Sequence, residues 1–375
     1  GEPPSPSFNT LVFSTNLKVA DVFFLMDTTG SMYSAIESLK ANIASIIAGI
    51  RGVVTDSWFG VGRFDDYPVS PFGASGDVVF RLHQRMTDDA VLVTAAVNAL
   101  DLDSGADYPE SHVPALWATA TGSGLGTYLT AAAGCTAAEV GYPCFRRTSI
   151  PIVIMVTDAP FHNGPSAYEP YTTAVTPAAP TYAEAVTALN AINARVVSIY
   201  TEGYSGAIVT DHVTQLATDT GTVDAGGSPL VFLLDTAGFA DQVVGAVETL
   251  ATAVPIRVDA IAADDPSDML DAVEEFMQSI HTNVSGASIW DPVLGEMRSC
   301  TAGIPTASPS TPPSVDYFTV VNPGVSVCFD IVPRTNDTIP STSVPLVFRA
   351  TVSVVGDTYM PLDTREVYFV VPPSI

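Results

Sequence analysis

Apolar runs and amphipathic stretches alternate along the first part of the chain. The run at 22–26 ends at Asp27, and apolar residues then recur at helical spacing over 32–50. The strongest run, at 149–156, leads in the same way to Asp158. Unbroken apolar runs are typical of parallel strands that helices cover on both faces. The alternation of strand and helix signals therefore predicts a doubly wound, mostly parallel α/β sheet.

The remaining signals of this part follow in the same order. We expect strands at 58–64, 78–82, 195–200 and 230–234, and helices at 87–100, 110–120, 181–193, 209–218 and 236–252. Ser31 stands where the cap of the first helix belongs, so we expect it to be the N-cap. A long loop at about 159–180, rich in Pro, Tyr and Ala, has a length that is usually functional or mobile.

After about residue 254 the composition of the chain changes, and Ser, Thr, Val and Pro dominate. We expect short strands at 256–261, 287–290, 315–321, 325–332, 344–355 and 364–371. A helix is expected over 266–281. Its apolar face would comprise Met269, Leu270, Val273, Phe276, Met277 and Ile280. Many short strands favour an all-β sandwich, so we predict an α/β domain over 19–254 and an additional β-sandwich domain over 255–375.

Acidic residues outnumber basic residues. The chain has 40 Asp and Glu against 14 Lys and Arg, which gives a formal net charge of -26. Because phosphate binding needs clustered basic residues, no nucleic acid is expected as a partner. An acidic chain suits cations instead. No uninterrupted apolar stretch reaches the ~18 residues that a membrane span needs, so no span is expected in this chain.

Four cysteines are present, without the paired C-x-x-C spacing of a zinc site. Cys135 and Cys144 close a short loop, and Cys300 and Cys328 flank a segment rich in Pro, Ser and Thr. Two local disulfides are therefore expected rather than four free thiols. Because disulfides form and persist in oxidising compartments, we expect an extracellular, cell-surface or periplasmic location.

Acidic and hydroxyl side chains gather in four loops that end predicted strands or precede a helix. These loops hold Asp27 with Thr29 and Ser31, Asp66, Asp107 with Glu110, and Asp158. The carboxyl ends of parallel strands share one rim of the sheet, where ligands of open α/β sheets bind. Oxygen ligands without His or Cys select hard cations such as Mg²⁺, Ca²⁺ or Mn²⁺. The pattern therefore predicts a divalent-cation site at this rim.

Taken in order, these loops resemble those of a von Willebrand factor A domain, and more narrowly those of the I-like domain of integrin β subunits. The matching segments are Asp27–Met32 (DTTGSM), Phe64–Pro71 (FDDYPVSP), Asp107–Glu110 (DYPE) and Val156–Ala159 (VTDA). The resemblance covers about residues 10–254. It implies a Rossmann-like α/β fold and an adhesion protein rather than an enzyme.

Carried onto this chain, the resemblance implies an adhesion-site metal, Mg²⁺ or Mn²⁺. Its ligands would be Asp27, Thr29, Ser31, Glu110 and Asp158. A second cation, Ca²⁺, would be held beside it by Asp66, Asp107, Glu110 and the backbone carbonyl of Pro109. The family places an Asn where Gly105 stands, so one side-chain ligand is lost there. Ser34 and Ala35 replace the two acids of a third site, which we expect to be weak or absent.

The C-terminal part resembles, less specifically, the hybrid domain of integrin β subunits, a β-sandwich into which the family threads its I-like domain. The resemblance therefore implies that residues 1–18, with a strand at 10–17, belong to the sandwich. The helix expected at 266–281 departs from that pattern. Epidermal-growth-factor-like cysteine repeats do not follow and Ala is abundant, so we expect a bacterial relative. The family also makes an α-like partner subunit a candidate.

Other interpretations of these residues stay open. The D-x-D-x-G-x-D spacing at 101–107 also suggests a calcium loop, although the twelve-residue form needs Glu at the position of His112. The five histidines have no ligand spacing and suit surface or capping roles. His162, four residues after Asp158, is the one that could line the site.

The sequence thus predicts a binding protein whose metal accepts a carboxylate from an Asp or Glu side chain of a protein ligand. Two other classes compete with it: a structural surface protein whose cations only stabilise the fold, and a Mg²⁺-dependent hydrolase that uses Asp27 and Asp158. Hydrolysis would need a general base or a positively charged clamp near the metal. Arg63 is the only basic residue that adjoins these loops, and it lies within a predicted strand.

Overall fold

The computed structural model describes residues 9–203, 206–267, 270–357 and 360–374. Contacts between Cα atoms divide the chain into two compact units. One unit spans Lys18–Val254, and the other combines the chain up to Leu17 with Pro255 onwards. These divisions lie within one residue of the expected boundaries. Among the described residues, no helix is both long and apolar enough to cross a bilayer.

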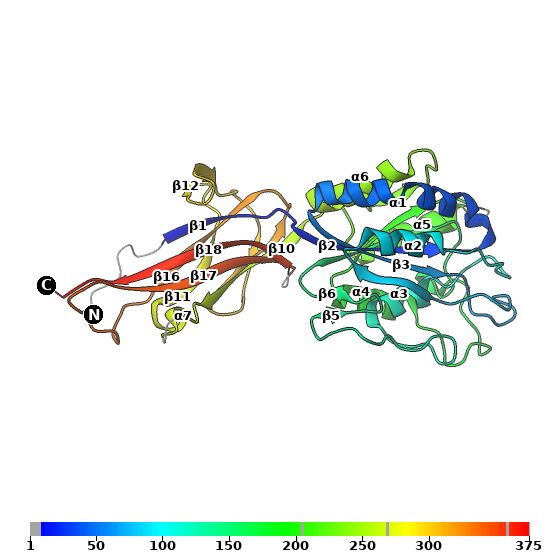
Figure 1. Ribbon diagram of the computed structural model, residues 1–375, viewed down its shortest axis with the longest axis horizontal. Coiled ribbons are helices and arrows are strands. Elements are labelled where there is room, and N and C mark those ends of the chain that lie inside the picture. Colours follow the sequence, from blue (N-terminus) through cyan, green and yellow to red (C-terminus); the bar gives the residue numbers. More distant parts are fainter. Residues whose placement is uncertain (1–8, 204–205, 268–269, 358–359, 375) are drawn as a thin grey trace. The chain divides into compact units, whose positions relative to one another are not determined.

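A six-stranded sheet forms the centre of the Lys18–Val254 unit, with the strand order β4-β3-β2-β7-β8-β9 (Figure 1). The strands are β2 (Val19–Asp27), β3 (Asp56–Phe64), β4 (Arg81–Thr87), β7 (Ile150–Thr157), β8 (Arg195–Tyr200) and β9 (Val231–Leu233). All neighbours are parallel except β3 and β4, which are antiparallel. Asp27 pairs with Phe64, and Met26 pairs with Val156. The strands β2, β3 and β7 therefore end at one rim of the sheet.

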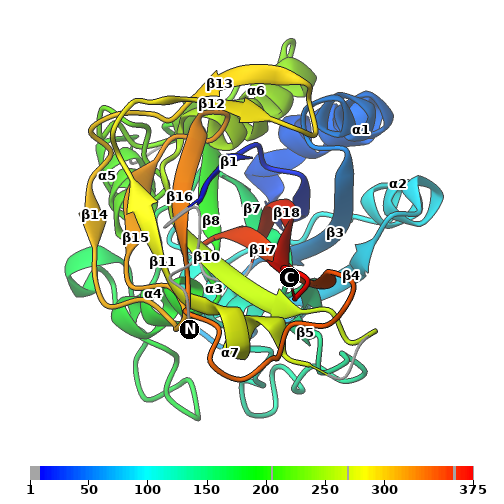
Figure 2. The same cartoon turned by 90° about the vertical axis from the view of Figure 1, so that its left-hand side faces the viewer.

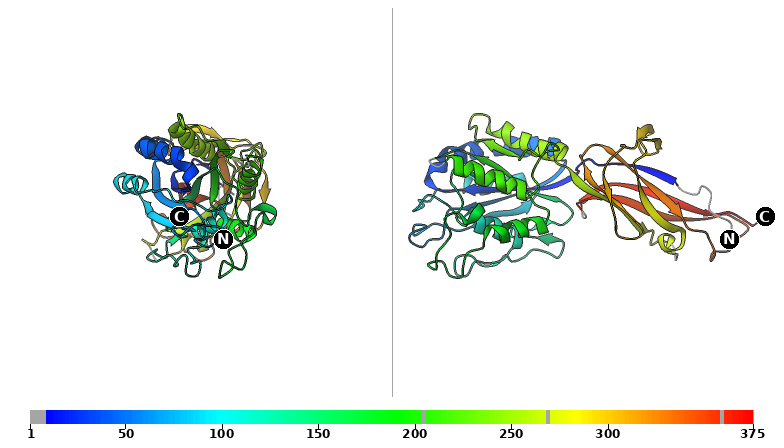
Figure 3. Two further views of the ribbon diagram at one scale, coloured as in Figure 1. Left: turned by 90° about the vertical axis from the view of Figure 1, so that its right-hand side faces the viewer. Right: turned by 180° about the vertical axis from the view of Figure 1, so that it is seen from behind.

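Helices cover both faces of this sheet, which confirms the predicted α/β class. They are α1 (Tyr33–Val53), α2 (Ala90–Asn98), α3 (His112–Thr121), α4 (Tyr182–Ala191), α5 (Gly206–Asp219) and α6 (Phe239–Ala253). One face packs against α3, α4 and α5 through a core that includes Phe23, Val153 and Leu189. The helices α1 and α6 lie side by side on the opposite face (Figures 1 and 3).

Two boundaries near the rim differ from the expectation. Ser31 lies in a short 3-10 helix, η1 (Gly30–Met32), and Met32 is the N-cap residue of α1. Ser31 does not cap α1 because its hydroxyl instead donates to an acidic side chain across the rim. The strand expected at 78–82 is β4, which begins at Arg81. Val78 belongs to the preceding loop because its backbone exchanges hydrogen bonds with Asp65.

In its described residues, the other unit contains two antiparallel sheets, a separate hairpin and one short helix (Figure 2), as expected of the predicted additional β domain. The three-stranded sheet has the order β1-β16-β11, and the five-stranded sheet has the order β14-β15-β10-β17-β18. The strands are β1 (Asn9–Ser14), β10 (Ile256–Asp264), β11 (Met277–Asn283), β14 (Thr306–Ala307), β15 (Tyr317–Val321), β16 (Ser326–Pro333), β17 (Leu346–Gly356) and β18 (Met360–Val371), with β12 (Ser288–Asp291) and β13 (Glu296–Ser299) in the hairpin. Phe329 of one sheet packs against Phe318 of the other, with ring centroids 5.2 Å apart. The core of this unit therefore lies between the two sheets.

The helix expected over 266–281 is wrong for most of its length. The structure has a short helix, α7 (Ala272–Phe276), and then β11, which pairs with β16. Met269 lies outside the described residues. The register of β11 shifts between Met277 and Ser279, as it does where a bulge adds one residue to a strand. Met277 and Ile280 are both buried, and their three-residue spacing imitates that of a helix.

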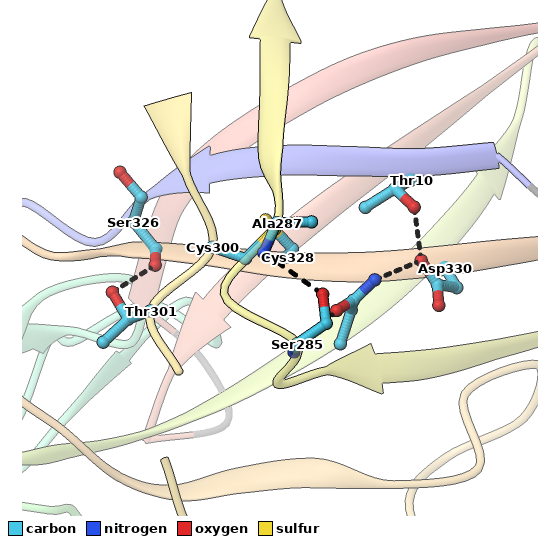
Figure 4. The surroundings of a disulfide bond; sticks show 9 residues. Thr10, Ser285, Ala287, Cys300, Thr301, Ser326, Cys328 and Asp330 are labelled. Carbon is cyan, nitrogen blue, oxygen red and sulfur yellow. Dashed lines mark hydrogen bonds between the residues drawn. A yellow bond between two sulfur atoms is a disulfide. The ribbon is translucent and has the colours of Figure 1, made fainter. Parts of the chain in front are cut away.

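Both predicted disulfides are present. Cys135–Cys144 closes the loop that carries the short strand β5 (Glu139–Val140), and its partner strand β6 (Phe145–Arg146) follows Cys144 directly. Cys300–Cys328 joins the residue after β13 to β16, and both of its cysteines are buried (Figure 4). This second bridge therefore fastens the β12–β13 hairpin to the three-stranded sheet.

Candidate metal centre

Backbone hydrogen bonds join the predicted loops at the rim of the α/β sheet. The Thr28 amide donates to the carbonyl oxygen of Phe64 at 2.9 Å, and the Asp103 amide donates to that of Thr28 at 2.9 Å. The Glu110 amide donates to the carbonyl oxygen of Pro160 at 3.0 Å. The first bond connects the loop after β2 to the last residue of β3, and each of the other two connects two different loops. The main chain itself therefore holds the acidic segments together.

Asp27, the last residue of β2, is fully buried. Its Oδ1 accepts hydrogen bonds from the amide and the hydroxyl of Thr29, at 3.0 and 2.7 Å. Its Oδ2 accepts from the Thr157 hydroxyl at 2.7 Å. The Thr157 hydroxyl oxygen also lies 2.7 Å from His112 Nε2. Donors on both sides thus fix the direction of the Asp27 carboxylate.

Ser31 and Asp158 continue this set of oxygens across the rim. The Ser31 hydroxyl donates to Asp158 Oδ1 at 3.0 Å, and its oxygen lies 3.5 Å from Thr29 Oγ1. Asp27, Thr29, Ser31 and Asp158 are four of the five residues expected at the adhesion-site metal, and we call them the adhesion row after that expectation. The backbone carbonyl of Asp158 accepts from the Tyr108 hydroxyl at 3.0 Å. Because Ser31 is exposed and Asp158 half-buried, this end of the row faces solvent.

Glu110 lies two residues before α3 and is buried, and its Oε2 has no hydrogen-bond partner among the described residues. Gly105 lies against it with φ +66°. A Cβ at this glycine would stand 3.1 Å from Glu110 Oε1 and 3.7 Å from Thr29 Cγ2. The glycine therefore leaves room for the Glu110 carboxylate near the adhesion row. A buried carboxylate oxygen without a donor is costly unless a cation compensates it.

Burial, and for some of them the charge of neighbouring acids, raises the pKa values of the clustered carboxyl groups. Burial, followed by the charge of Asp158, raises the pKa of Asp27 to about 7. Burial also raises the pKa of Asp158. Burial, followed by the charges of Asp27 and Asp66, raises the pKa of Glu110 well above its usual value. Carboxylates this close disfavour one another's charged forms, and a divalent cation among them would offset that repulsion.

Asp66 and Asp107, the acids expected at the second site, lie together, and His162 lies with them. One ligand atom of each is within 4.8 Å of the others, and we call these three residues the histidine cluster. His162 Nε2 lies 3.2 Å from Asp107 Oδ2 and 3.5 Å from Asp66 Oδ2. Burial raises the pKa of Asp66 to about 7, although His162 and the Tyr171 hydroxyl lower it. Pro109 is buried in the loop that carries Asp107.

Reasoning from the sequence missed three side chains that order the rim: Thr157, His112 and Tyr171. Thr157 and His112 support Asp27, and the Tyr171 hydroxyl donates to Asp66 Oδ1 at 2.5 Å. The position of Thr157, between a buried strand and an acid, was a usable signal. Tyr171 comes from the long loop at 159–180, where only the length of the loop hinted at a function.

The acids of the segment 101–107 turn to different partners rather than to one point, which contradicts the calcium-loop interpretation. Asp103 pairs with Arg63 Nη1 at 2.7 Å, whereas Asp107 belongs to the histidine cluster. Arg63 Nη1 also lies 3.5 Å from Asp65 Oδ2. The basic side chain that adjoins the rim is therefore engaged with the acids around it.

No family model and no curated protein sequence matches the chain. Solved structures to which it is similar include von Willebrand factor type A from Catenulispora acidiphila, at 14% identity and a TM-score of 0.41, covering 98% of this chain and 74% of that one. Another is proximal thread matrix protein 1 from the mussel byssus, at 15% identity and a TM-score of 0.39, covering 67% of this chain and 51% of that one. These similarities are distant, so the functional interpretation rests on the geometry of the rim.

Proposed function

We propose that the chain is a divalent-metal-dependent adhesion protein with an integrin β-like arrangement of its binding site. One observation supports this above all: oxygen-bearing side chains from separate loops line one rim of the sheet. They are Asp27, Thr29, Ser31, Glu110 and Asp158. Mg²⁺ or Mn²⁺ is the metal we propose for them.

The residues of the adhesion row, together with Glu110, fit such an ion. Carboxylates and hydroxyls are the ligands that hard divalent cations prefer. The buried Oε2 of Glu110, which has no hydrogen-bond partner among the described residues, would gain a cation as its partner. The raised pKa values of Asp27 and Glu110 mark carboxylates whose charge a cation would stabilise.

The row also suits an incoming carboxylate. Thr29 and Ser31 are neutral ligands, so a metal held partly by hydroxyls keeps part of its positive charge. The exposed position of Ser31 gives a ligand access from solvent. An Asp or Glu side chain of a protein ligand could then complete the coordination shell, which is the chemistry we propose for adhesion.

We propose binding rather than hydrolysis because the nearest bases and cations already have partners. His112 is fully buried and contacts Thr157 and the carbonyl of Glu110. Burial lowers the pKa of His112 well below its usual value. Arg63 pairs with Asp103 and Asp65. These groups are poorly placed to activate water or to clamp a leaving group at the adhesion row.

The two disulfides support an oxidising compartment as the site of action. We therefore propose an extracellular, cell-surface or periplasmic location. Such a location would also expose the rim to protein ligands in the surrounding medium.

Selection from a displayed library of random peptides tests the proposal. The full chain would be immobilised in Mg²⁺, and bound peptides would be eluted with EDTA. We expect the eluted peptides to be enriched in Asp or Glu. Ser31→Ala and Asp158→Asn should each weaken peptide binding by about 10- to 100-fold or more, because even indirect partners of a metal carry that much. Ser34→Ala, an exposed serine on α1, is the matched control.

Peptides without acidic enrichment, or binding that survives EDTA, would contradict the proposal. If Mg²⁺ raises the melting temperature but no acidic peptide is captured, the cation serves the fold alone, as in a structural surface protein. Catalytic turnover of a phosphate or carboxyl ester, lost in Ser31→Ala, would favour a hydrolase.

A further inference from the structure

The histidine cluster brings together side chains from three separate segments. Asp66 follows β3, Asp107 lies in the loop before α3, and His162 follows β7. Their ligand atoms lie within 4.8 Å of one another. This inference does not rest on the proposed adhesion function, because none of the three residues belongs to the adhesion row.

Asp66 is fully buried and held in one orientation. Its Oδ1 accepts from the Tyr67 amide at 2.6 Å and from the Tyr171 hydroxyl at 2.5 Å. Its Oδ2 is buried without a hydrogen-bond partner among the described residues, although it lies 3.5 Å from His162 Nε2. The carboxylate thus directs an unsatisfied oxygen into the cluster, beside the imidazole.

The ring of His162 is held in place as well. It packs edge-on against Phe72, with ring centroids 5.1 Å apart, and at a tilt against Tyr171, with ring centroids 4.4 Å apart. Its Nδ1 lies 2.5 Å from the carbonyl oxygen of Glu169, so Nδ1 carries the hydrogen. In the neutral ring, Nε2 then presents its lone pair toward the two carboxylates. A backbone carbonyl at the other ring nitrogen is a recurrent support of metal-binding histidines.

The donor set favours a transition metal over calcium. Calcium takes six to eight oxygen ligands, whereas imidazole nitrogen suits zinc and related first-row ions. Two carboxylates and one imidazole supply three ligands, and water can fill the rest of the shell. Asp107 is exposed, while Asp66 and His162 are buried, so an ion can enter on the Asp107 side.

We propose that Asp66, Asp107 and His162 form a mixed nitrogen and oxygen site for Zn²⁺ or a chemically similar transition-metal ion. This metal differs from the Ca²⁺ that the sequence suggests for the second site. The difference arises from His162, a nitrogen ligand that a purely acidic site lacks.

Metal titration of the full chain tests this site. After EDTA treatment and dialysis, the protein would be titrated with Zn²⁺ alone by calorimetry and with Co²⁺ by visible absorption. We expect a Zn²⁺ site that excess Ca²⁺ does not displace, with a zinc–nitrogen distance of about 2.0–2.1 Å by X-ray absorption. His162→Gln and Asp107→Asn should each weaken Zn²⁺ binding by at least about 100-fold, the upper range seen for supporting residues alone. His281→Gln, a histidine of the sandwich unit, is the matched control.

Unchanged Zn²⁺ affinity in both variants would overturn the proposal, as would a wild-type chain that binds Ca²⁺ but not Zn²⁺. Zn²⁺ binding that is lost in Ser31→Ala but kept in His162→Gln would place the ion in the adhesion row and also overturn it. If His162→Gln does not fold, Asp107→Asn decides alone, because its side chain is exposed. The peptide selection measures ligand binding at the adhesion row, whereas the titration measures Zn²⁺ binding at the histidine cluster. Either proposal can therefore fail without the other.

Discussion

At the scale of single residues, Thr157 is the side chain that connects Asp27 to the interior. Thr157→Val keeps the shape of the side chain but removes the hydroxyl that donates to Asp27 Oδ2. We expect Mn²⁺ affinity to fall by about 10- to 100-fold, as it does when an outer partner of a metal ligand is lost. The free energy of unfolding should fall by about 1–3 kcal/mol, because buried polar groups lose a partner. Calorimetry and urea unfolding measure the two effects.

Thr94→Val on α2 is the control for that substitution. The Thr94 hydroxyl donates to the carbonyl of Ala90 at 2.7 Å within its own helix, and we expect no change in Mn²⁺ affinity. Equal metal affinities of Thr157→Val and the wild type would show that Asp27 does not depend on this hydroxyl.

Buried ionisable residues of the rim make the stability of the metal-free protein depend on pH. Asp27 and Asp66 have pKa values of about 7 in the folded chain, against an ordinary value of 3.8. Because folding raises these pKa values, the folded state binds more protons than the unfolded state between about pH 4 and pH 7, and stability falls as the pH rises through that window. His162 acts in the same direction. Burial lowers its pKa, but Asp107 and Asp66 raise it overall, so its ion pairs are lost at high pH.

Metal binding should reverse this trend, because protons and cations compete for the same carboxylates. We expect the melting temperature in Mg²⁺ to exceed that in EDTA by little at about pH 5 and by about 5 °C or more at about pH 8. At the higher pH, binding of the cation should raise the free energy of unfolding by a few kcal/mol. Differential scanning calorimetry at both pH values checks the expectation. A difference that does not grow with pH would show that the Asp27 carboxylate does not hold the Mg²⁺ ion.

Sequence alone could identify those site residues whose positions follow from regular structure. Asp27 directly follows a long apolar run and Asp158 lies one residue beyond another, so their place at a common rim follows from the geometry of a parallel sheet. His162 and Tyr171 lie in an irregular loop, where no period links sequence to position. Their contacts with Asp66 depend on how the loop folds back over the rim.

At the scale of elements, the strands β2 and β7 were predictable because both of their faces are buried and their sequences contain long apolar runs. The segment at 266–281 was not, because its periodicity is misleading. The bulge in β11 shifts the alternation by one residue, so burial on one face of a strand gives the spacing of a helix. Pairing with β16 then decides the conformation, and that partner lies far along the chain.

The two disulfides should differ in their contribution to stability. They close loops with sequence separations of 9 and 28 residues. Loop-closure entropy predicts a loss of about 2–3 kcal/mol for Cys135→Ala with Cys144→Ala, and of about 3–4 kcal/mol for Cys300→Ala with Cys328→Ala. Urea unfolding of both double variants measures the difference. The ranking would be wrong if removal of the Cys135–Cys144 bridge costs more.

At the scale of the whole molecule, the α/β unit is an insertion into the sandwich. The strand β1 precedes it in sequence and pairs with β16, which follows it. The fragment 18–254 contains its own sheet, helices and rim, so we expect it to fold alone and to bind Mn²⁺ like the full chain. The fragment 255–375 lacks β1 and leaves one edge of β16 unpaired, so we expect it to self-associate.

Size-exclusion chromatography and circular dichroism of the two fragments test this expectation. Addition of a peptide of residues 9–17 should restore a monomeric 255–375 fragment, whereas a scrambled peptide of the same composition should not. A 255–375 fragment that is monomeric and folded without the peptide would show that β1 is dispensable.

The pairing of β1 with β16 also implies a delay during synthesis, because β1 is made long before its partner strand. Thr10 and Asp330, which share a hydrogen bond across these strands, are 320 residues apart in the chain. At about 5–20 residues per second, a ribosome needs about 15–60 s to make the second strand after the first. During that interval the α/β unit can emerge and fold completely, while β1 waits without its partner. The strand β1 can thus pair only after β16 has been made, and the nascent chain needs protection of β1 until then.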